Sequence, residues 1–212
     1  ENGMDYIGTR GAVADKRYLV KDVNGIKIGM VNYTYGQDTS ANSLINRFSD
    51  SNLDLFYADM EQQIADMEAD GAEAIVLYIH WGYEYFLTPN KYQTAVANKM
   101  CEMGVDVIIG GHPHKIQPLE LITADNGNQT VCLYSMGNFL SNQVIESMYG
   151  GNRSNSAHYQ DHVSCPIPDV SNRYNDTKWD QHVTDCNDNG HTEDGLLFQT
   201  TFTKYSDGVV KL

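Results

Sequence analysis

In the middle of the chain, segments whose apolar residues recur at a helical spacing alternate with short continuous apolar runs. From Leu53 the apolar residues follow one another at steps of three or four residues until Gly71, which predicts an amphipathic helix with a glycine stop. The continuous apolar run at 74–79 is too short for an ordinary helix and predicts a strand buried on both faces. The same pair repeats as a helical stripe at 92–103 and a buried strand at 105–109. Two successive helix and strand units predict parallel strands and an α/β fold.

Turn-forming residues predict a hairpin near each end of the chain. The β-rich runs at 17–23 and 26–33 are joined by Asn24-Gly25, the dipeptide best suited to a type I′ turn. Near the other end, the alternating run at 196–203 turns into residues 209–212. This second pattern predicts a closing hairpin.

The apolar run at 131–134 predicts a further buried strand. The amino-acid composition changes sharply after it. Residues 141–194 contain no Leu and no Phe and are crowded with Asn, Asp and Ser. Loops of this length inside compact domains are usually functional lids or partly disordered segments. We therefore expect one domain over residues 1–212, with 141–194 as a polar insertion or lid.

Charge and length narrow the functional classes. The 212 residues include 14 Lys+Arg and 28 Asp+Glu, which gives a formal net charge of −14. This excess of carboxylates argues against nucleic acid as a partner, because such proteins neutralise phosphates with basic side chains. No apolar stretch approaches the roughly 20 residues that a membrane-spanning helix needs. Since the chain opens on Glu1 without a methionine, we expect a mature or trimmed product whose beginning lies upstream.

Histidines follow two successive predicted strands and are the main candidates for chemistry. His80 comes after the first strand, and His112 and His114 come after the second, behind a Gly-Gly pair. Ligand sites of open α/β sheets lie outside the carboxyl ends of the strands, and residues two apart in an extended turn point to the same side. Neutral imidazole is a common ligand of Zn, Mn or Fe, so the pattern predicts a partial metal site. The alternative is that each histidine is a polar strand end with one backbone partner.

Three motifs in order along the chain carry a resemblance to a known family. They are Ile-His-Trp-Gly-Tyr-Glu-Tyr at 79–85, Gly-Val-Asp-Val-Ile-Ile-Gly-Gly-His-Pro-His at 104–114 and Leu-Tyr-Ser-Met-Gly-Asn-Phe at 133–139. With them the chain resembles the CapA family, also called PgsA, of poly-γ-glutamate capsule biosynthesis proteins. Members of this family look like relatives of the calcineurin-type metallophosphoesterases. The resemblance covers about residues 1–142 and 195–212.

The resemblance implies a sandwich of two β-sheets flanked by helices, with a two-metal site at the strand ends. Carried over by motif position, His80 and His112 would face one metal and His114 the other. Glu84 and Asn138 match motif positions and are expected to line the pocket, neither of them as a ligand. Such a pair of metals activates a water and clamps the attacked centre.

Two upstream motifs of the family are not found in this chain. CapA-like chains carry an early strand that ends in an Asp-containing turn, followed by an Asn-Asn-His element. We therefore expect residues 1–212 to be the C-terminal portion of a longer domain. Three histidines without carboxylates would hold one divalent ion, Mn, Zn or Fe, and the binuclear site would form only in the full-length protein.

The resemblance also implies a function and a place in the cell. It indicates a bacterial cell-surface protein of capsule biosynthesis, on the extracellular face of the membrane and anchored by a segment outside this chain. The expected partners are poly-γ-glutamate or a related anionic polymer, and membrane-bound synthase subunits. Two alternatives stay open: a general metal-dependent phosphoesterase acting on a phosphorylated small molecule, and a non-catalytic accessory subunit that binds polymer. Both as a capsule biosynthesis protein with this metal site and as a general phosphoesterase, the chain would belong to a metal-dependent hydrolase of the metallophosphoesterase type.

The cysteines divide into a core pair and a pair in the insertion. Cys101 and Cys132 sit in apolar patterns and are expected to be small core residues. Cys165 and Cys186 lie near histidines at spacings that suit zinc, yet outside the cell they could equally close a disulfide. Disulfide, zinc and neither all stay open here. The histidines concerned are His158, His162 and His182.

Overall fold

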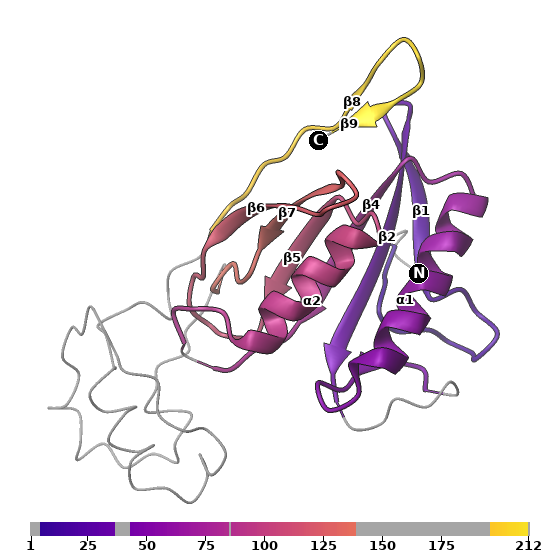
Figure 1. The fold of residues 1–212 in the computed structure, drawn as a ribbon. Helices are drawn as coiled ribbons and strands as arrows, with labels where there is room; N and C mark the ends of the chain where they lie inside the picture. Colours follow the sequence, from indigo (N-terminus) through magenta and orange to yellow (C-terminus); the bar gives the residue numbers. More distant parts are fainter. Residues whose placement is uncertain (1–4, 37–42, 85, 139–195, 212) are drawn as a thin grey trace, which may run out of the picture.

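A computed structural model describes residues 5–36, 43–84, 86–138 and 196–211 of the protein (Figure 1). Strands and helices alternate through the middle of the chain, as the sequence predicts for an α/β protein. Their bounds are β1 Tyr18–Val23, β2 Ile26–Tyr35, β3 Arg47–Phe48, α1 Leu53–Ala69, β4 Ala74–His80, α2 Lys91–Glu102, β5 Val107–Gly111, β6 Leu119–Thr123, β7 Gln129–Leu133, β8 Thr203–Lys204 and β9 Val210–Lys211.

The main sheet has seven strands, and its centre is parallel. Along the sheet the strands run in the order β1-β2-β4-β5-β7-β6, and the short β3 pairs with β2. The neighbours β2–β4, β4–β5 and β5–β7 are parallel, whereas β1 and β6 are antiparallel to their neighbours. The carboxyl ends of β4 and β5 therefore lie side by side, since His80 pairs with Gly111. The predicted α/β class is confirmed.

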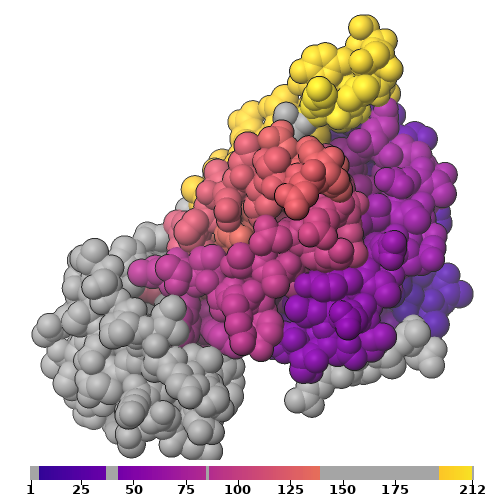
Figure 2. All heavy atoms as spheres, in the orientation of Figure 1, coloured from indigo at the N-terminus to yellow at the C-terminus, as the bar shows by residue number. Residues whose placement is uncertain are grey.

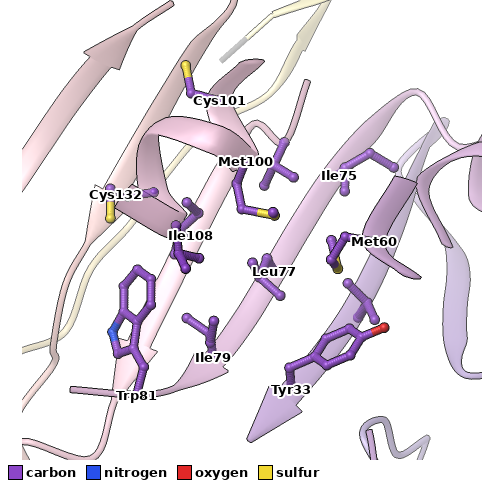
Figure 3. Packing of buried hydrophobic residues seen from close by; sticks show 14 of the residues in the cluster. Tyr33, Met60, Ile75, Leu77, Ile79, Trp81, Met100, Cys101, Ile108 and Cys132 are labelled. Atoms are coloured by element: carbon purple, nitrogen blue, oxygen red, sulfur yellow. The ribbon is translucent and has the colours of Figure 1, made fainter. Parts of the chain in front are cut away.

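Both helices pack on one face of this sheet (Figure 1). Alternate residues of β4 point to that face, and Leu77 at its centre is fully buried. Met60 of α1 and Met100 of α2 belong to the same buried cluster (Figure 3). The stripe of apolar positions on each helix thus becomes the core, as its spacing predicts. Cys101 and Cys132 are free and buried in it, which confirms their predicted place.

The first predicted hairpin is confirmed and the closing one is shorter than predicted. Asn24 and Gly25 have φ values of 55° and 87°, as a type I′ turn between β1 and β2 requires. The closing hairpin pairs only Thr203–Lys204 with Val210–Lys211, so the strand predicted from residue 196 is wrong over most of its length. Figure 2 shows this hairpin projecting from the body of the molecule.

Strand β6 is missing from the sequence-based prediction. Leu119 and Leu121 are 51% and 59% exposed, so this strand carries no buried apolar run of the kind that marked the others. The turn that joins β6 to β7 contains Asn126-Gly127, a hairpin dipeptide that would have revealed the strand.

A polar cluster ties β2 to α1 on the helix-covered face. The phenol of Tyr33 donates to Asp59 at 2.6 Å, and the Arg17 guanidinium bonds the other oxygen of that carboxylate at 2.5 Å. Asn46 accepts from Arg17 Nε at 2.9 Å. Burial, and then the negative charge of Asp59, raise the pKa of Tyr33 far above its ordinary value.

This cluster predicts a loss of stability at alkaline pH. Above about pH 10 the phenol ionises in the unfolded chain while it stays protonated in the folded one, so stability falls as pH rises. We expect Tyr33→Phe to show a smaller fall in the free energy of unfolding between about pH 9 and pH 11. Urea unfolding across that range measures it, with Tyr205→Phe at an exposed tyrosine as the control. Parallel curves for Tyr33→Phe and the unchanged chain would contradict this prediction.

Candidate metal centre

The carboxyl ends of β4 and β5 bring three imidazoles together. His80 is the last residue of β4, and His112 follows the last residue of β5. Their ring centroids are 4.6 Å apart, and those of His112 and His114 are 6.1 Å apart. The sequence correctly predicted that these side chains meet at one edge of the sheet.

The backbone that carries the histidines is not the extended turn that the sequence predicted. His112 and His114 have φ values of 99° and 57°, in the left-handed region that side chains other than glycine rarely enter. Pro113 lies between them, and a residue before proline is ordinarily extended. Each such residue costs on the order of 1–3 kcal/mol, and strain of this kind clusters at functional sites. The turn is therefore held against its local preference.

Glu84 joins two of these histidines in one compact group. One ligand atom each from Glu84, His112 and His114 lies within 4.8 Å of the others. Two imidazoles and a carboxylate are a donor set that Zn, Mn and Fe accept, so these residues fit a divalent metal. The sequence assigned Glu84 to the pocket lining and His80 to the ligands. In the structure Glu84 belongs to the compact group, and His80 lies beside it, outside the three.

Asn138 orients one imidazole of the group. Its side-chain oxygen lies 2.9 Å from Nδ1 of His114. With the proton on Nδ1, the ring donates to this amide oxygen, and Nε2 is then left with its lone pair. Metal-binding histidines almost always have a second partner of this kind. Asn138, which the sequence places at the pocket, therefore contacts the His114 ring and restrains its orientation.

The charge state of His80 also suits a metal site. Although its side chain reaches solvent, partial burial and then the neighbouring His114 lower the pKa of His80, while the Glu84 carboxylate opposes the change. The neutral imidazole is therefore favoured, and this is the form that binds metals. Tyr35 at the end of β2 stacks on His80 at 5.8 Å and contacts His112 at 4.9 Å between ring centroids.

Two buried glutamines hold the segment that carries Glu84. Gln117 donates from its amide to the carbonyls of Phe86 at 2.9 Å and Thr88 at 3.1 Å, and it accepts from Gln93 at 2.8 Å. Gln93 in turn completes a capping box with Asn90 at the start of α2. The sequence analysis missed this clamp, although the Asn-x-x-Gln spacing at 90–93 is a signature of such a box.

Breaking this clamp is expected to weaken both the fold and the metal site. In Gln117→Leu the carbonyls of Phe86 and Thr88 lose their buried donor, which costs about 2 kcal/mol. Because the segment that holds Glu84 is released, metal affinity should also fall about 10-fold, as for other supporting residues. Urea unfolding and calorimetric titration with Mn²⁺ measure the two effects, with Gln62→Leu on the exposed face of α1 as control. A loss of stability with unchanged affinity would show that the clamp does not position Glu84.

These observations define the class of protein: an α/β protein with a candidate histidine and carboxylate metal site at the carboxyl edge of a mostly parallel sheet. Comparison with protein families then places the chain. Residues 1–143 match the family described as bacterial capsule synthesis protein PGA_cap, and the chain belongs to this family. The family has the metallophosphoesterase-like fold, so the predicted family and fold class are both confirmed.

Two curated relatives carry names that agree with this placement. The chain is 29% identical over 147 residues to the capsule biosynthesis protein CapA of Bacillus anthracis, covering 68% of this chain and 34% of that protein. It is 30% identical over 147 residues to the PGA biosynthesis protein CapA of Bacillus subtilis (strain 168), covering 68% and 36%. The chain therefore spans about a third of the length of these relatives.

A solved structure and a search for membrane helices complete the comparison. A hypothetical protein from Thermus thermophilus aligns with a TM-score of 0.34 and 15% identity, over 57% of this chain and 38% of that one. Neither helix in the part of the chain that the structure describes is long and apolar enough to span a membrane. The zinc and disulfide alternatives for residues 158–186, and the lid at 141–194, lie outside the described residues.

Proposed function

We propose that this chain is the metal-binding portion of a cell-surface protein that takes part in making poly-γ-glutamate or a related anionic capsular polymer. The observation that supports it is the compact group of Glu84, His112 and His114, which lies within the region that matches the capsule synthesis family. A divalent metal held there would supply Lewis-acid activation of a water or of the attacked centre.

The residues of the chain divide the work at this site. Glu84, His112 and His114 would hold the metal, and the contact with Asn138 restrains the orientation of the His114 ring. The ring of Tyr35 packs on His80 and His112 and restricts the freedom of both imidazoles. The strained turn fixes the ligand positions before the metal arrives, so little ordering is needed on binding.

The proposal includes partners and a location. The chain acts as the C-terminal portion of the family domain, and residues elsewhere in the full-length protein complete a binuclear site. The anionic polymer and membrane-bound synthase subunits are the expected partners, nucleic acid is not, and an anchor outside this chain holds the protein at the extracellular face. The family placement and the names of the CapA relatives support this part.

The experiment compares capsule production with metal-dependent turnover. The full-length gene carrying His112→Ala is returned to a deletion strain, and the purified protein is assayed for metal content and for hydrolysis of an aryl phosphate with Mn²⁺. Loss of polymer together with loss of metal supports the proposal. Unchanged polymer production would refute a role for this site. If the unchanged protein hydrolyses the aryl phosphate, and His112→Ala abolishes this hydrolysis but leaves capsule production intact, a general phosphoesterase is favoured.

A further inference from the structure

A partly enclosed pocket opens beside the metal centre and is not explained by metal binding. It has a volume of about 100 Å³ and lies between the end of β2, the segment after β4 and the start of α2. His112 and Tyr35 line it and also take part in the histidine cluster. The pocket therefore adjoins the metal centre, and a single ligand can reach both.

The walls of the pocket are mainly aromatic. Phe48 and Trp81 are 4% and 2% exposed and form its buried side, while Tyr35 at the mouth is 43% exposed. Tyr83 and Tyr92 add two further rings, and the other lining residues are Asp50, Gly82, Asn90, Gln93, Val96 and His112. Rings of this kind pack against the flat apolar face of another ring. The volume is below the roughly 150 Å³ of a dry cavity that holds benzene, so one ring with its outer edge in solvent fills the space.

The polar groups of the pocket select among ring-shaped ligands. Among the described residues that line it, Asp50 is the one acidic side chain, and none is Lys or Arg. An anionic group such as the free α-carboxylate of a γ-linked glutamate would be repelled there. A carboxylate accepts hydrogen bonds without donating any, so it suits a ring that carries hydroxyl groups. A plain aryl ring offers Asp50 no hydrogen-bond donor.

We propose that this pocket binds a sugar ring whose attached anionic group lies at the metal centre. The substrate class is then a sugar phosphate or a sugar-linked phosphodiester. The placing of the anionic half rests on the metal centre of the function proposed above, whereas the sugar half rests on the pocket alone. Tyr35 joins the two halves, because its ring contacts His112 of the compact group and the neighbouring His80, and it lines the pocket.

The test measures binding to Mn²⁺-loaded protein by calorimetry and by the emission of Trp81. Trp179→Phe serves as the background, since it removes the second tryptophan. We expect glucose 1-phosphate to bind about 10-fold more tightly than glycerol 3-phosphate, which has the anion but no ring. Asp50→Asn should reduce this advantage to about 2-fold, because the acceptor for the hydroxyls loses its charge. Asp54→Asn, at an exposed carboxylate outside the pocket, should leave it unchanged.

Any other result contradicts either the sugar pocket or the proposed metal function, and the two can be told apart. Equal affinity for the two phosphates overturns the sugar pocket, and so does phenyl phosphate binding as tightly as glucose 1-phosphate with no effect of Asp50→Asn. Failure to bind Mn²⁺ refutes the proposed metal function instead. In that case free glucose is titrated against the metal-free protein. A change in Trp81 emission that Asp50→Asn removes then supports the pocket, and no change overturns it.

Discussion

His112→Ala and His114→Ala will each weaken the binding of Mn²⁺ or Zn²⁺ by at least about 100-fold. Loss of a supporting residue already costs roughly 10- to 100-fold in metal affinity, and these side chains are two of the three candidate ligands in the compact group. Glu84→Gln should fall in the same range, because the amide keeps the shape of the side chain but loses its charge. Calorimetric titration measures the affinities.

Two further variants separate ligand loss from damage to the fold. Glu61→Gln removes an exposed carboxylate from α1 and should bind metal like the unchanged chain. His112→Gly should be more stable than His112→Ala, by about 1 kcal/mol, because glycine accepts the φ of 99° without strain. Undiminished affinity in His112→Ala would show that the metal, if it binds, lies elsewhere.

Gly110→Ala is expected to be the most destabilising single methyl in the sheet. A Cβ at this position would lie 2.1 Å from the carbonyl oxygen of Tyr134 and 2.6 Å from Nε1 of Trp81. These two atoms form a buried hydrogen bond of 2.9 Å, which the methyl would force apart. Overpacking costs roughly 1–3 kcal/mol, and a broken buried hydrogen bond adds to it, so we expect a loss of about 3 kcal/mol or more.

The next residue provides a matched control. A Cβ on Gly111 would meet no atom within 4 Å, and its φ lies outside the left-handed region. Gly111→Ala should therefore change the free energy of unfolding by less than about 0.5 kcal/mol. Thermal and urea unfolding of the two variants give the comparison. Similar stabilities would mean that the Trp81 hydrogen bond does not lie over Gly110 as described.

The sequence predicted those parts of the fold whose burial produces a recognisable pattern of apolar residues along the chain. The stripe from Leu53 to Gly71 and the run at 74–79 became α1 and β4 because one face of the helix and both faces of the strand are covered. Strand β6 was missed because its residues are mostly exposed, so its pairing with β7 leaves no apolar run. Propensity alone rarely reveals such an edge strand.

Only the part of the candidate site that lies at the ends of strands was predictable from the sequence. His80 ends β4 and His112 follows the end of β5, so their proximity results from the parallel pairing of these strands. Glu84 reaches the site through the course of the segment after β4, which the contacts of Gln117 fix from a distant part of the chain. The left-handed turn at His112 contradicts local preference, and a sequence pattern cannot report backbone strain that tertiary contacts impose.

The parallel centre of the sheet sets the order in which the site can form during folding. The hairpins β1–β2 and β6–β7 join neighbours in sequence, whereas β4 and β5 pair only after the crossover through α2. Pairings that close longer segments form more slowly. Glu84 follows β4 and the two histidines follow β5, so the complete ligand set exists only after this late step. A bound metal should consequently slow unfolding and leave the folding rate nearly unchanged.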